Sequence, residues 1–297
     1  MRLLVTGLNG FVAGSIITQA RKYFEVHGAD VTEAVGLPSD IYVHQLDLLD
    51  KDAVVTLFQR IKPDAVIHTA AIANIDVCEI NKELAWKVNV GITETIADLC
   101  RQNDAKMIFC STDSVFDGVK GRYNEEDEPH AVNFYAETKV AAEKIVLGAS
   151  DKNVVARLSL VMGMPVVGKG NSFLADTIEK LQNGQEVKFP ENEIRTPVDV
   201  VTLGAALSEL AANSFGGIIH LSGSTRINRY KMAVQIAEKL GFDPGLITAT
   251  DSNAMKGRAP RPNDASMDNS LAKKILNTPM RTLTEGLELT LNYKIEE

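Results

Sequence analysis

Short apolar runs alternate along this chain with longer segments whose apolar residues recur at helical spacing. The apolar runs predict strands at Leu3–Val5, Tyr42–Val43, Ala65–Ile67, Met107–Phe109 and Val154–Ala156. The helical segments between them include residues 51–61, 81–103 and 134–149. Strands that alternate with helices predict a parallel sheet covered by helices on both faces, which is a doubly wound, Rossmann-type α/β fold.

The alternation becomes less regular after Met162. The pattern predicts a loop at 163–170, a helix at 172–183, a short strand at 186–189 and a helix that begins within Thr196–Asp199, where Pro197 suits a first turn. A late strand is predicted at 217–221, and mainly helix after it, interrupted at 257–262. We therefore expect a dinucleotide-binding domain of residues 1–162 and about 195–222. A smaller, interleaved and mainly helical substrate-binding portion takes about 163–194 and 223–297.

Composition narrows the class of protein. The chain has 297 residues, of which 45% are hydrophobic, so it can bury a large core. No apolar run approaches the roughly 18 residues that a membrane span needs, and we expect no membrane partner. The short run Met1–Thr6 is typical of a first strand rather than a secretory signal, which predicts a cytoplasmic protein. Cys78, Cys100 and Cys110 lack metal-ligand spacing, so we expect buried, reduced thiols and no metal site.

Net charge limits the partners. The formal charge is −8, which argues against nonspecific binding of nucleic acid, because such binding depends on lysine and arginine neutralising phosphates. A local cationic pocket for a phosphorylated small molecule remains compatible with this charge. Small helix positions such as Ala141 and Ala142 leave a homodimer open.

A glycine-rich turn, Thr6–Gly14, follows the first predicted strand and opens a helix. Glycine permits the tight turn and lets backbone approach a pyrophosphate, while the helix N-terminus supplies N–H donors. The residues expected to contact a nicotinamide dinucleotide here are Gly7, Asn9, Gly10, Phe11 and Val12. The alternative is a tight strand-to-helix turn that binds nothing.

Further cofactor contacts are expected where later strands end. Asp30 ends the second strand, where a carboxylate accepts from the adenosine ribose 2′-hydroxyl and repels a 2′-phosphate. The cofactor is therefore NAD or NADP, with Asp30 favouring NAD, unless Asp30 caps the next segment instead. Asp47 and Leu48 are expected beside the adenine. Small residues also follow the fourth strand, either to admit the cofactor or to pack a helix against the sheet: Ala70, Ala71 and Ala73.

A tyrosine and a lysine lie one helical turn apart in the segment 134–149. Tyr135 can give a proton to a carbonyl oxygen that receives a hydride, and the positive charge of Lys139 would lower the phenol pKa. Lys139 can also bind the nicotinamide ribose. Thr112, at the end of the fifth strand, can hold the substrate oxygen. The alternative is an exposed pair that is common on helices, but the position of this pair after a strand-end Ser-Thr favours catalysis.

Four segments together resemble the extended short-chain dehydrogenase/reductases and, within them, the dTDP-4-dehydrorhamnose reductases. These are Ser111–Gly118, Asn133–Lys139, Arg157–Ser159, and Arg261–Pro262 followed by Met267–Ser270. The resemblance covers nearly the whole chain. It implies Thr112, Tyr135 and Lys139 as catalytic residues and Gly7, Gly10 and Asp30 around the cofactor, with Asp113, Ser114 and Val115 at the sugar. Asn89 matches the family's helix asparagine, which has a structural role.

The chain departs from the family pattern at three positions. Ser114 stands where the family usually has tyrosine, Leu160 where it has an aromatic residue, and Ala136 where it has glycine. The first two lie near the expected sugar pocket, which leaves the sugar and the nucleotide open. Arg195 and Arg261 are candidate ligands of a nucleotide diphosphate, because guanidinium groups match phosphate oxygens. The alternative for both arginines is a surface or domain-bridging ion pair.

The expected function is NAD(P)H-dependent reduction of a 4-keto sugar, linked to a nucleotide. One alternative is an epimerase or dehydratase of the same superfamily, and Asp113 beside Thr112 keeps the dehydratase open. The other is a non-catalytic regulatory subunit on the same fold, because a fold does not fix a function.

Overall fold

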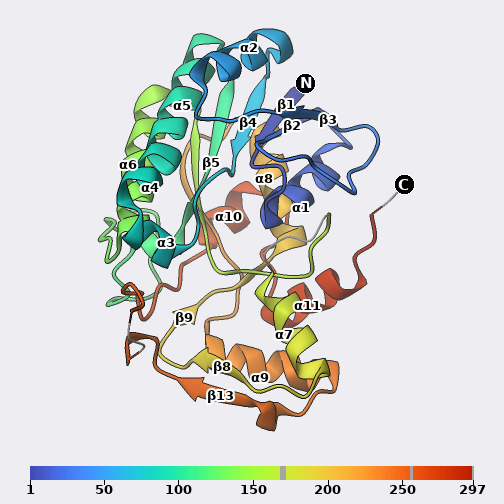
Figure 1. The fold of residues 1–297 in the computed structure, drawn as a ribbon, viewed down its shortest axis with the longest axis vertical. Helices are drawn as coiled ribbons and strands as arrows, with labels where there is room; N and C mark the ends of the chain where they lie inside the picture. Colours follow the sequence, from blue (N-terminus) through green and yellow to red (C-terminus); the bar gives the residue numbers. More distant parts are fainter. Residues whose placement is uncertain (168–171, 255–256, 296–297) are drawn as a thin grey trace.

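The computed structural model describes residues 1–167, 172–254 and 257–295. A seven-stranded sheet forms its centre (Figure 1), and its strands are all parallel in the order β11-β6-β5-β4-β1-β2-β3. They are β1 (Arg2–Thr6), β2 (Glu25–Asp30), β3 (Tyr42–Gln45), β4 (Ala65–His68), β5 (Lys106–Thr112), β6 (Val154–Leu158) and β11 (Gly217–Leu221). The predicted strands of the first 158 residues all lie in this sheet, and the predicted doubly wound fold is confirmed.

The order of the strands creates a crevice at the carboxyl ends of β1 and β4. The chain runs outward from β1 through β2 to β3, then returns to β4 on the other side of β1 and continues to β11. Ligands of such sheets bind where the strand order reverses in this way. The same end of the sheet faces the smaller lobe in Figure 1.

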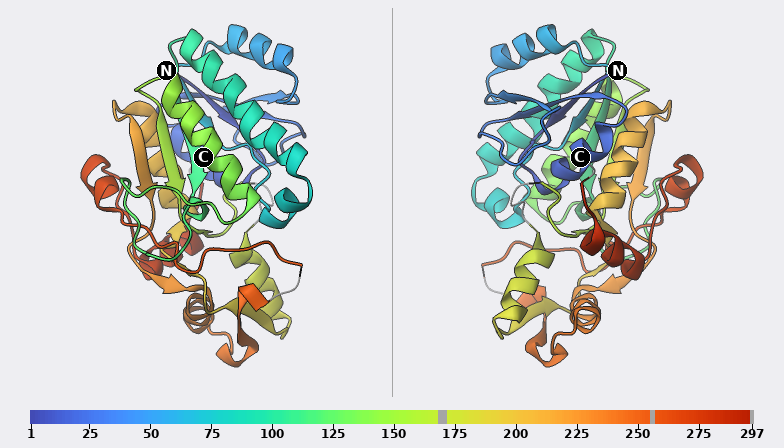
Figure 2. Two further views of the ribbon diagram at one scale, coloured as in Figure 1. Left: turned by 90° about the vertical axis from the view of Figure 1, so that its left-hand side faces the viewer. Right: turned by 90° about the vertical axis from the view of Figure 1, so that its right-hand side faces the viewer.

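Helices cover both faces of the sheet (Figure 2). One layer holds α2 (Lys51–Ile61), α5 (Ile92–Gln102) and α6 (Phe134–Ala149), and the other holds α1 (Phe11–Ala20) and α8 (Val200–Ala212). Side chains of β1 alternate between the layers, with Leu4 in the first core and Leu3 and Val5 in the second. Because both faces are covered, the strands are apolar throughout rather than alternating.

The helical pattern predicted at 81–103 is interrupted in the structure. It divides into α4 (Lys82–Trp86), a π-helical turn η1 (Lys87–Gly91) and α5, and a separate helix α3 (Ile75–Ile80) precedes them. The π turn carries Asn89, whose amide accepts from Ile72 N at 2.8 Å and donates to Ile72 O at 3.1 Å. Asn89 thus has the structural role implied by the resemblance, because it holds the loop after β4.

The smaller lobe lies at the bottom of Figure 1. It is built from α7 (Phe173–Gln182), β8 (Val187–Pro190), α9 (Arg229–Leu240), β13 (Ile247–Thr250) and α11 (Leu283–Asn292), with the short turns η3 (Pro244–Leu246) and η4 (Ser252–Ala254). α7 and β8 match the prediction, whereas β13 and β12 (Ile227–Asn228) were missed. Their partners are β8 and β9 (Ile194–Arg195), more than thirty residues away, so no local pattern reveals them. Residues 168–171 of the predicted loop lie outside the described residues.

The helix predicted to begin within Thr196–Asp199 begins at Val200 instead, so that prediction is wrong. Val198 and Asp199 form β10, which pairs with β7 (Val161–Met162). The Asp199 carboxylate then caps the helix by accepting from Thr202 N at 2.8 Å. Because the strand pair of β10 and β7 includes Val198 and Asp199, the helix begins after Pro197 rather than at it.

The C-terminal part returns to the main sheet. In and after α10 (Ser270–Ile275), Ala272, Leu276 and Met280 lie in the same core as α1 and α8. The expected division of the chain at about residue 222 stays a prediction. No helix in the described part of the chain is long and apolar enough to cross a membrane. All three cysteines are buried and outside disulfides.

Candidate active site

The glycine turn lies between the ends of β1 and β4. Gly7 has φ of +75°, and a Cβ there would lie 2.9 Å from Ala70 Cα, so only glycine fits. A Cβ on Gly10 would lie 2.9 Å from Gly7 O. Gly10 is the N-cap of α1, and it makes no side-chain cap hydrogen bond. The uncapped end of α1 therefore offers N–H donors to an anion such as a pyrophosphate, and the cradle fits a dinucleotide.

Asp30 joins this turn to the end of β2. Its Oδ2 accepts from Asn9 N at 3.0 Å, and its Oδ1 accepts from Thr32 N and Thr32 Oγ1, each at 3.2 Å. The carboxylate thus lies beside the turn, as a ribose contact requires, and it also caps the next segment. Both readings left open by the sequence are compatible here, and the ribose role stays a prediction.

The other expected cofactor residues differ in accessibility. Leu48 is buried in the core under α2, which leaves only its backbone for an adenine. Asp47 is exposed and accepts from Leu49 N at 2.9 Å. Ala70 and Ala71 are half-buried and Ala73 is exposed. Ala70 packs against Gly7, which accounts for a small residue at this position.

The three expected catalytic side chains meet at the carboxyl end of β5. Thr112 is the last residue of β5, and the side chain of Asn133 caps α6 by accepting from Ala136 N at 2.9 Å. Tyr135 and Lys139 therefore lie in the first turns of α6, with exposed fractions of 9% and 3%. Thr112 acts on the Tyr135 phenol and lowers its pKa, so the two side chains lie close together. The buried tyrosine and lysine of α6 thus lie beside a half-buried threonine that is distant in sequence.

Lys139 is poised to bind a ligand. Burial lowers the pKa of its ammonium to about 8. Its Nζ lies 4.0 Å from the centroid of the Phe109 ring, and within the described ranges no acceptor forms a hydrogen bond with it. A buried ammonium without an acceptor is costly. The hydroxyls of a nicotinamide ribose would supply the acceptors, so this residue also fits the cofactor.

The electrostatics of Tyr135 differ from the prediction. Burial raises the pKa of the phenol above its ordinary value, and the negative charge of Asp113 raises it further. We expected Lys139 to lower this pKa, and that prediction is wrong here. The reason is that desolvation of the buried phenol, together with the charge of Asp113, outweighs the effect of Thr112, which acts to lower the pKa.

The sugar-pocket candidates follow Thr112 in the short turn η2 (Asp113–Val115). Asp113 is buried, which raises its pKa, and its carboxylate accepts from Ser114 Oγ at 3.3 Å and Ser159 Oγ at 3.4 Å. The side chain of Val115 is fully buried against Phe116, so the prediction that it binds substrate is wrong for that side chain. The side chain of Val115 instead packs into the hydrophobic cluster under the turn.

Leu160, the other departure from the family pattern, lies in the smaller lobe. It is half-buried and packs on the core that contains Met162 and Leu283. Ser114 is 8% exposed and sits beside Thr112, with its N–H donating to Thr112 Oγ1 at 3.1 Å. Of the two departures, Ser114 is therefore the one beside the catalytic group.

Both candidate phosphate ligands form ion pairs within the chain. Arg195 is buried, with Nε 3.5 Å from Asp113 Oδ2, and its remaining nitrogens donate to the carbonyls of Ile194, Pro262 and Asn263. Arg261 forms a two-pronged pair with Asp76 at 2.7 and 2.8 Å. The structure therefore favours the ion-pair alternative for both arginines.

One residue near the catalytic group escaped the sequence reasoning. Glu143 lies one turn beyond Lys139 on α6, is 3% exposed and accepts from Ser111 Oγ at 2.5 Å. Arg157 of β6 donates to it at 2.8 Å through Nη2. The spacing Tyr135, Lys139, Glu143 was a signal available in the sequence, because residues four apart share a helix face.

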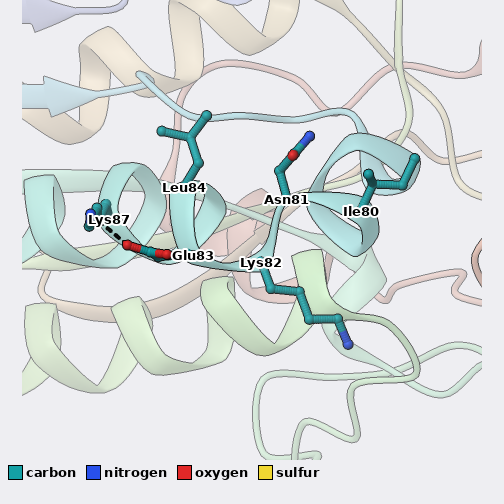
Figure 3. Close-up of a pocket in the computed structure, with 6 residues that line it drawn as sticks. All are labelled: Ile80, Asn81, Lys82, Glu83, Leu84 and Lys87. Carbon is teal, nitrogen blue, oxygen red and sulfur yellow. Dashed lines mark ion pairs between the residues drawn. The ribbon is translucent and has the colours of Figure 1, made fainter.

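Two surface hollows lie away from this group. One, of about 380 Å³, is formed by α3, α4 and η1 (Figure 3) and is lined by Ile80, Asn81, Lys82, Glu83, Leu84 and Lys87. Glu83 and Lys87 form an ion pair there at 2.8 Å. The other, of about 310 Å³, lies between α7 and β8. No catalytic candidate lines either hollow.

Known proteins that are similar to this chain include reductases and a subunit of another enzyme. The model described as RmlD substrate binding domain matches residues 1–295. The crystal structure of a hypothetical dTDP-4-dehydrorhamnose reductase from Sulfolobus tokodaii is 31% identical, with a TM-score of 0.84, over 97% of this chain and 99% of that one. The dTDP-4-dehydrorhamnose reductase of Bacillus anthracis, solved with NADP, is 24% identical with a TM-score of 0.84 over 98% of both chains. Methionine adenosyltransferase 2 subunit beta of Xenopus laevis is 29% identical over 98% of this chain and 87% of its own length.

Proposed function

Because this chain belongs to the RmlD substrate binding domain family, we propose that it catalyses the NAD(P)H-dependent reduction of a 4-keto sugar carried on a nucleotide. One observation supports the proposal beyond the similarity of fold. Tyr135 and Thr112 form a hydroxyl pair at the carboxyl end of β5, with the free ammonium of Lys139 one turn away. Reduction of a ketone needs a proton donor and a polar contact for the oxygen, and this pair supplies both.

Each side chain has a distinct task in this proposal. The nicotinamide cofactor supplies the hydride when it is bound. The phenol of Tyr135 gives its proton to the sugar oxygen, and its raised pKa keeps that proton in place until then. The hydroxyl of Thr112 donates a hydrogen bond to the same oxygen. The buried ammonium of Lys139 binds the hydroxyls of the nicotinamide ribose.

The cofactor site is the turn of Gly7 and Gly10 at the start of α1. The NADP complex of the Bacillus anthracis reductase, which has the same fold, supports a nicotinamide dinucleotide in this chain as well. Asp30 beside the turn favours NAD over NADP in our proposal. Cytoplasmic location, a homodimer and the absence of nucleic acid remain parts of the proposal.

A second candidate function is that of a subunit in a larger enzyme. The similarity to methionine adenosyltransferase 2 subunit beta, over nearly the whole chain, favours it. Such a subunit needs no proton donor at Tyr135. The two candidates therefore differ in whether the protein turns over a nicotinamide cofactor by itself.

The test is a screen of nucleotide-linked 4-keto sugars, with NADH and NADPH, that follows the absorbance of the reduced nicotinamide. The reductase proposal expects cofactor oxidation in proportion to sugar consumed. An epimerase or dehydratase retains its cofactor, so product formed without net oxidation would favour those rivals. Binding of cofactor with no turnover on any such sugar, together with an effect on methionine adenosyltransferase activity, would favour the subunit.

A further inference from the structure

A buried carboxylate connects the three elements that surround the catalytic group. Glu143 of α6 accepts from Ser111 Oγ of β5, the residue before Thr112. Arg157 of β6 donates to it through Nε at 3.1 Å and Nη2 at 2.8 Å. All three residues are less than 5% exposed. One side chain therefore ties the helix of Tyr135 and Lys139 to the strand of Thr112.

The same carboxylate acts on the charge of Lys139, which lies one turn earlier on α6. Burial is the largest cause that lowers the pKa of Lys139, and negative charge on Cys110, Glu143 or Cys78 acts in the opposite direction. Burial raises the pKa of Cys110 to about 12 and that of Cys78 above its ordinary value, so both thiols stay neutral.

Two further titratable groups face Lys139 and stay neutral. On β4, burial and then the charge of Lys139 lower the pKa of His68 to about 3. On α6, burial raises the pKa of Tyr135. Among the described residues that act on Lys139, Glu143 is therefore the carboxylate.

We propose that Glu143 is a positioning residue that holds α6 against β5 and keeps the buried side chain of Lys139 positively charged. This inference rests on the proposed function for its catalytic meaning, because a charged Lys139 matters to a reductase. The structural role of Glu143 is independent of the proposed function. A functional site must hold its groups within about 0.5 Å, and a buried carboxylate bonded to two neighbouring strands supplies that constraint.

The test measures the titration of Lys139 itself, in protein without cofactor, by NMR of ¹³Cε-labelled lysine. The Lys139 signal is assigned by its loss in Lys139→Met. We expect the wild-type midpoint near 8 and a midpoint lower by about one pH unit in Glu143→Gln, because the amide keeps the shape but removes the charge. The matched control is Glu137→Gln, an exposed acid on the same helix, which should leave the midpoint unchanged.

A variant that separates charge from tethering is Ser111→Ala. It removes one hydrogen bond but keeps the Glu143 carboxylate, so the Lys139 midpoint should hold while turnover falls about tenfold. If Glu143→Gln fails to fold because Arg157 is left unpaired, Glu143→Gln/Arg157→Met is compared with Arg157→Met, so that the two proteins differ only in the Glu143 charge. The Lys139 midpoint should then be lower in the double variant than in Arg157→Met.

The outcomes distinguish this inference from the proposed function. An unchanged Lys139 midpoint in a folded Glu143 variant overturns the inference, whatever the protein reduces. Unchanged turnover in Ser111→Ala overturns its tethering part. Absence of turnover in the wild type overturns the proposed function, while a shifted midpoint would still support the role of Glu143 toward Lys139.

Discussion

The guanidinium Nε of Arg195 lies 3.5 Å from Oδ2 of Asp113, and both side chains are buried. Arg195 belongs to β9, and Asp113 directly follows Thr112, one of the residues for which we propose a catalytic role. This ion pair ties β9 to the turn that follows β5. It also holds the negative charge that raises the pKa of Tyr135.

Replacing Asp113 should therefore make Tyr135 easier to ionise. In Asp113→Asn the negative charge is lost, and the pKa of Tyr135 should fall by about one unit or more. Ultraviolet titration of tyrosinate, compared with Asp113→Asn/Tyr135→Phe, isolates this phenol. A Tyr135 titration that stays in place would show that burial alone sets it. The melting temperature should also fall, because Arg195 is left without its partner.

Tyr135→Phe removes one hydroxyl and little volume. If Tyr135 donates the proton, turnover should fall by roughly a hundredfold or more while the fold and cofactor affinity persist. Steady-state rates together with cofactor titration check this. Near-normal turnover would eliminate Tyr135 as the donor.

Asp30→Ala should shift the cofactor preference toward NADP(H) by about tenfold, because a carboxylate beside the ribose repels a 2′-phosphate. The ratio of dissociation constants for NADPH and NADH is the measurement. Asp52→Ala, an exposed acid at the start of α2, is the control. Equal ratios in wild type and Asp30→Ala would leave Asp30 with only its bonds to Asn9 and Thr32.

Ser114 gives less stacking area to a sugar than the tyrosine usual in the family. We expect poor efficiency on dTDP-4-dehydrorhamnose or preference for a related 4-keto sugar, and improved efficiency on the rhamnose precursor in Ser114→Tyr. The comparison is kcat/KM on several nucleotide-linked 4-keto sugars for both proteins. Wild-type efficiency that is highest on the rhamnose precursor would show a tolerated substitution. Because Ser114 is only 8% exposed, the larger ring should also lower the melting temperature.

Lys106 gives a pH dependence of stability. Burial lowers the pKa of its ammonium to about 8, and the ammonium donates to the carbonyls of Leu210 and Asn213 at 2.6 and 2.8 Å. In the unfolded chain its pKa is about 10.4. Between these two values the unfolded chain binds more protons, so the free energy of unfolding should rise with pH, by at most about 1.4 kcal/mol per unit.

The measurement is urea unfolding at several pH values for wild type and Lys106→Met. The variant should lack this rise and should melt at a lower temperature, because the end of α8 loses its cap. Lys139 titrates in the same pH range and contributes to the curves of both proteins. The difference between the wild-type and variant curves therefore isolates the contribution of Lys106. Parallel curves would contradict the prediction.

Local patterns predicted the central sheet and two of its helices with the observed bounds. The helices 51–61 and 134–149 begin after Asp50 and Asn133, whose side chains cap them at 3.0 and 2.9 Å. Buried strands are continuous apolar runs because helices cover both faces. Helix caps and apolar runs involve residues close together in the chain, so they can be recognised in a single sequence.

Pairings between distant residues escaped the same reasoning. β10 displaced the predicted start of α8, and the π turn that carries Asn89 has no period of its own in the sequence. The buried position of Val115 depends on packing against Phe116 and on Tyr123. Each of these features requires knowing which segments meet.

The sequence by itself determined the sheet, the glycine turn at Gly7 and the placement of Tyr135 and Lys139 one turn apart, because strand burial, glycine geometry and helix period act locally. Only the tertiary structure decided the electrostatics. It buried Tyr135 so that its pKa rises rather than falls, and it committed Arg195 to Asp113. The physical reason is that charges act through distance and solvent exposure, and both depend on segments that the chain brings together only when it folds.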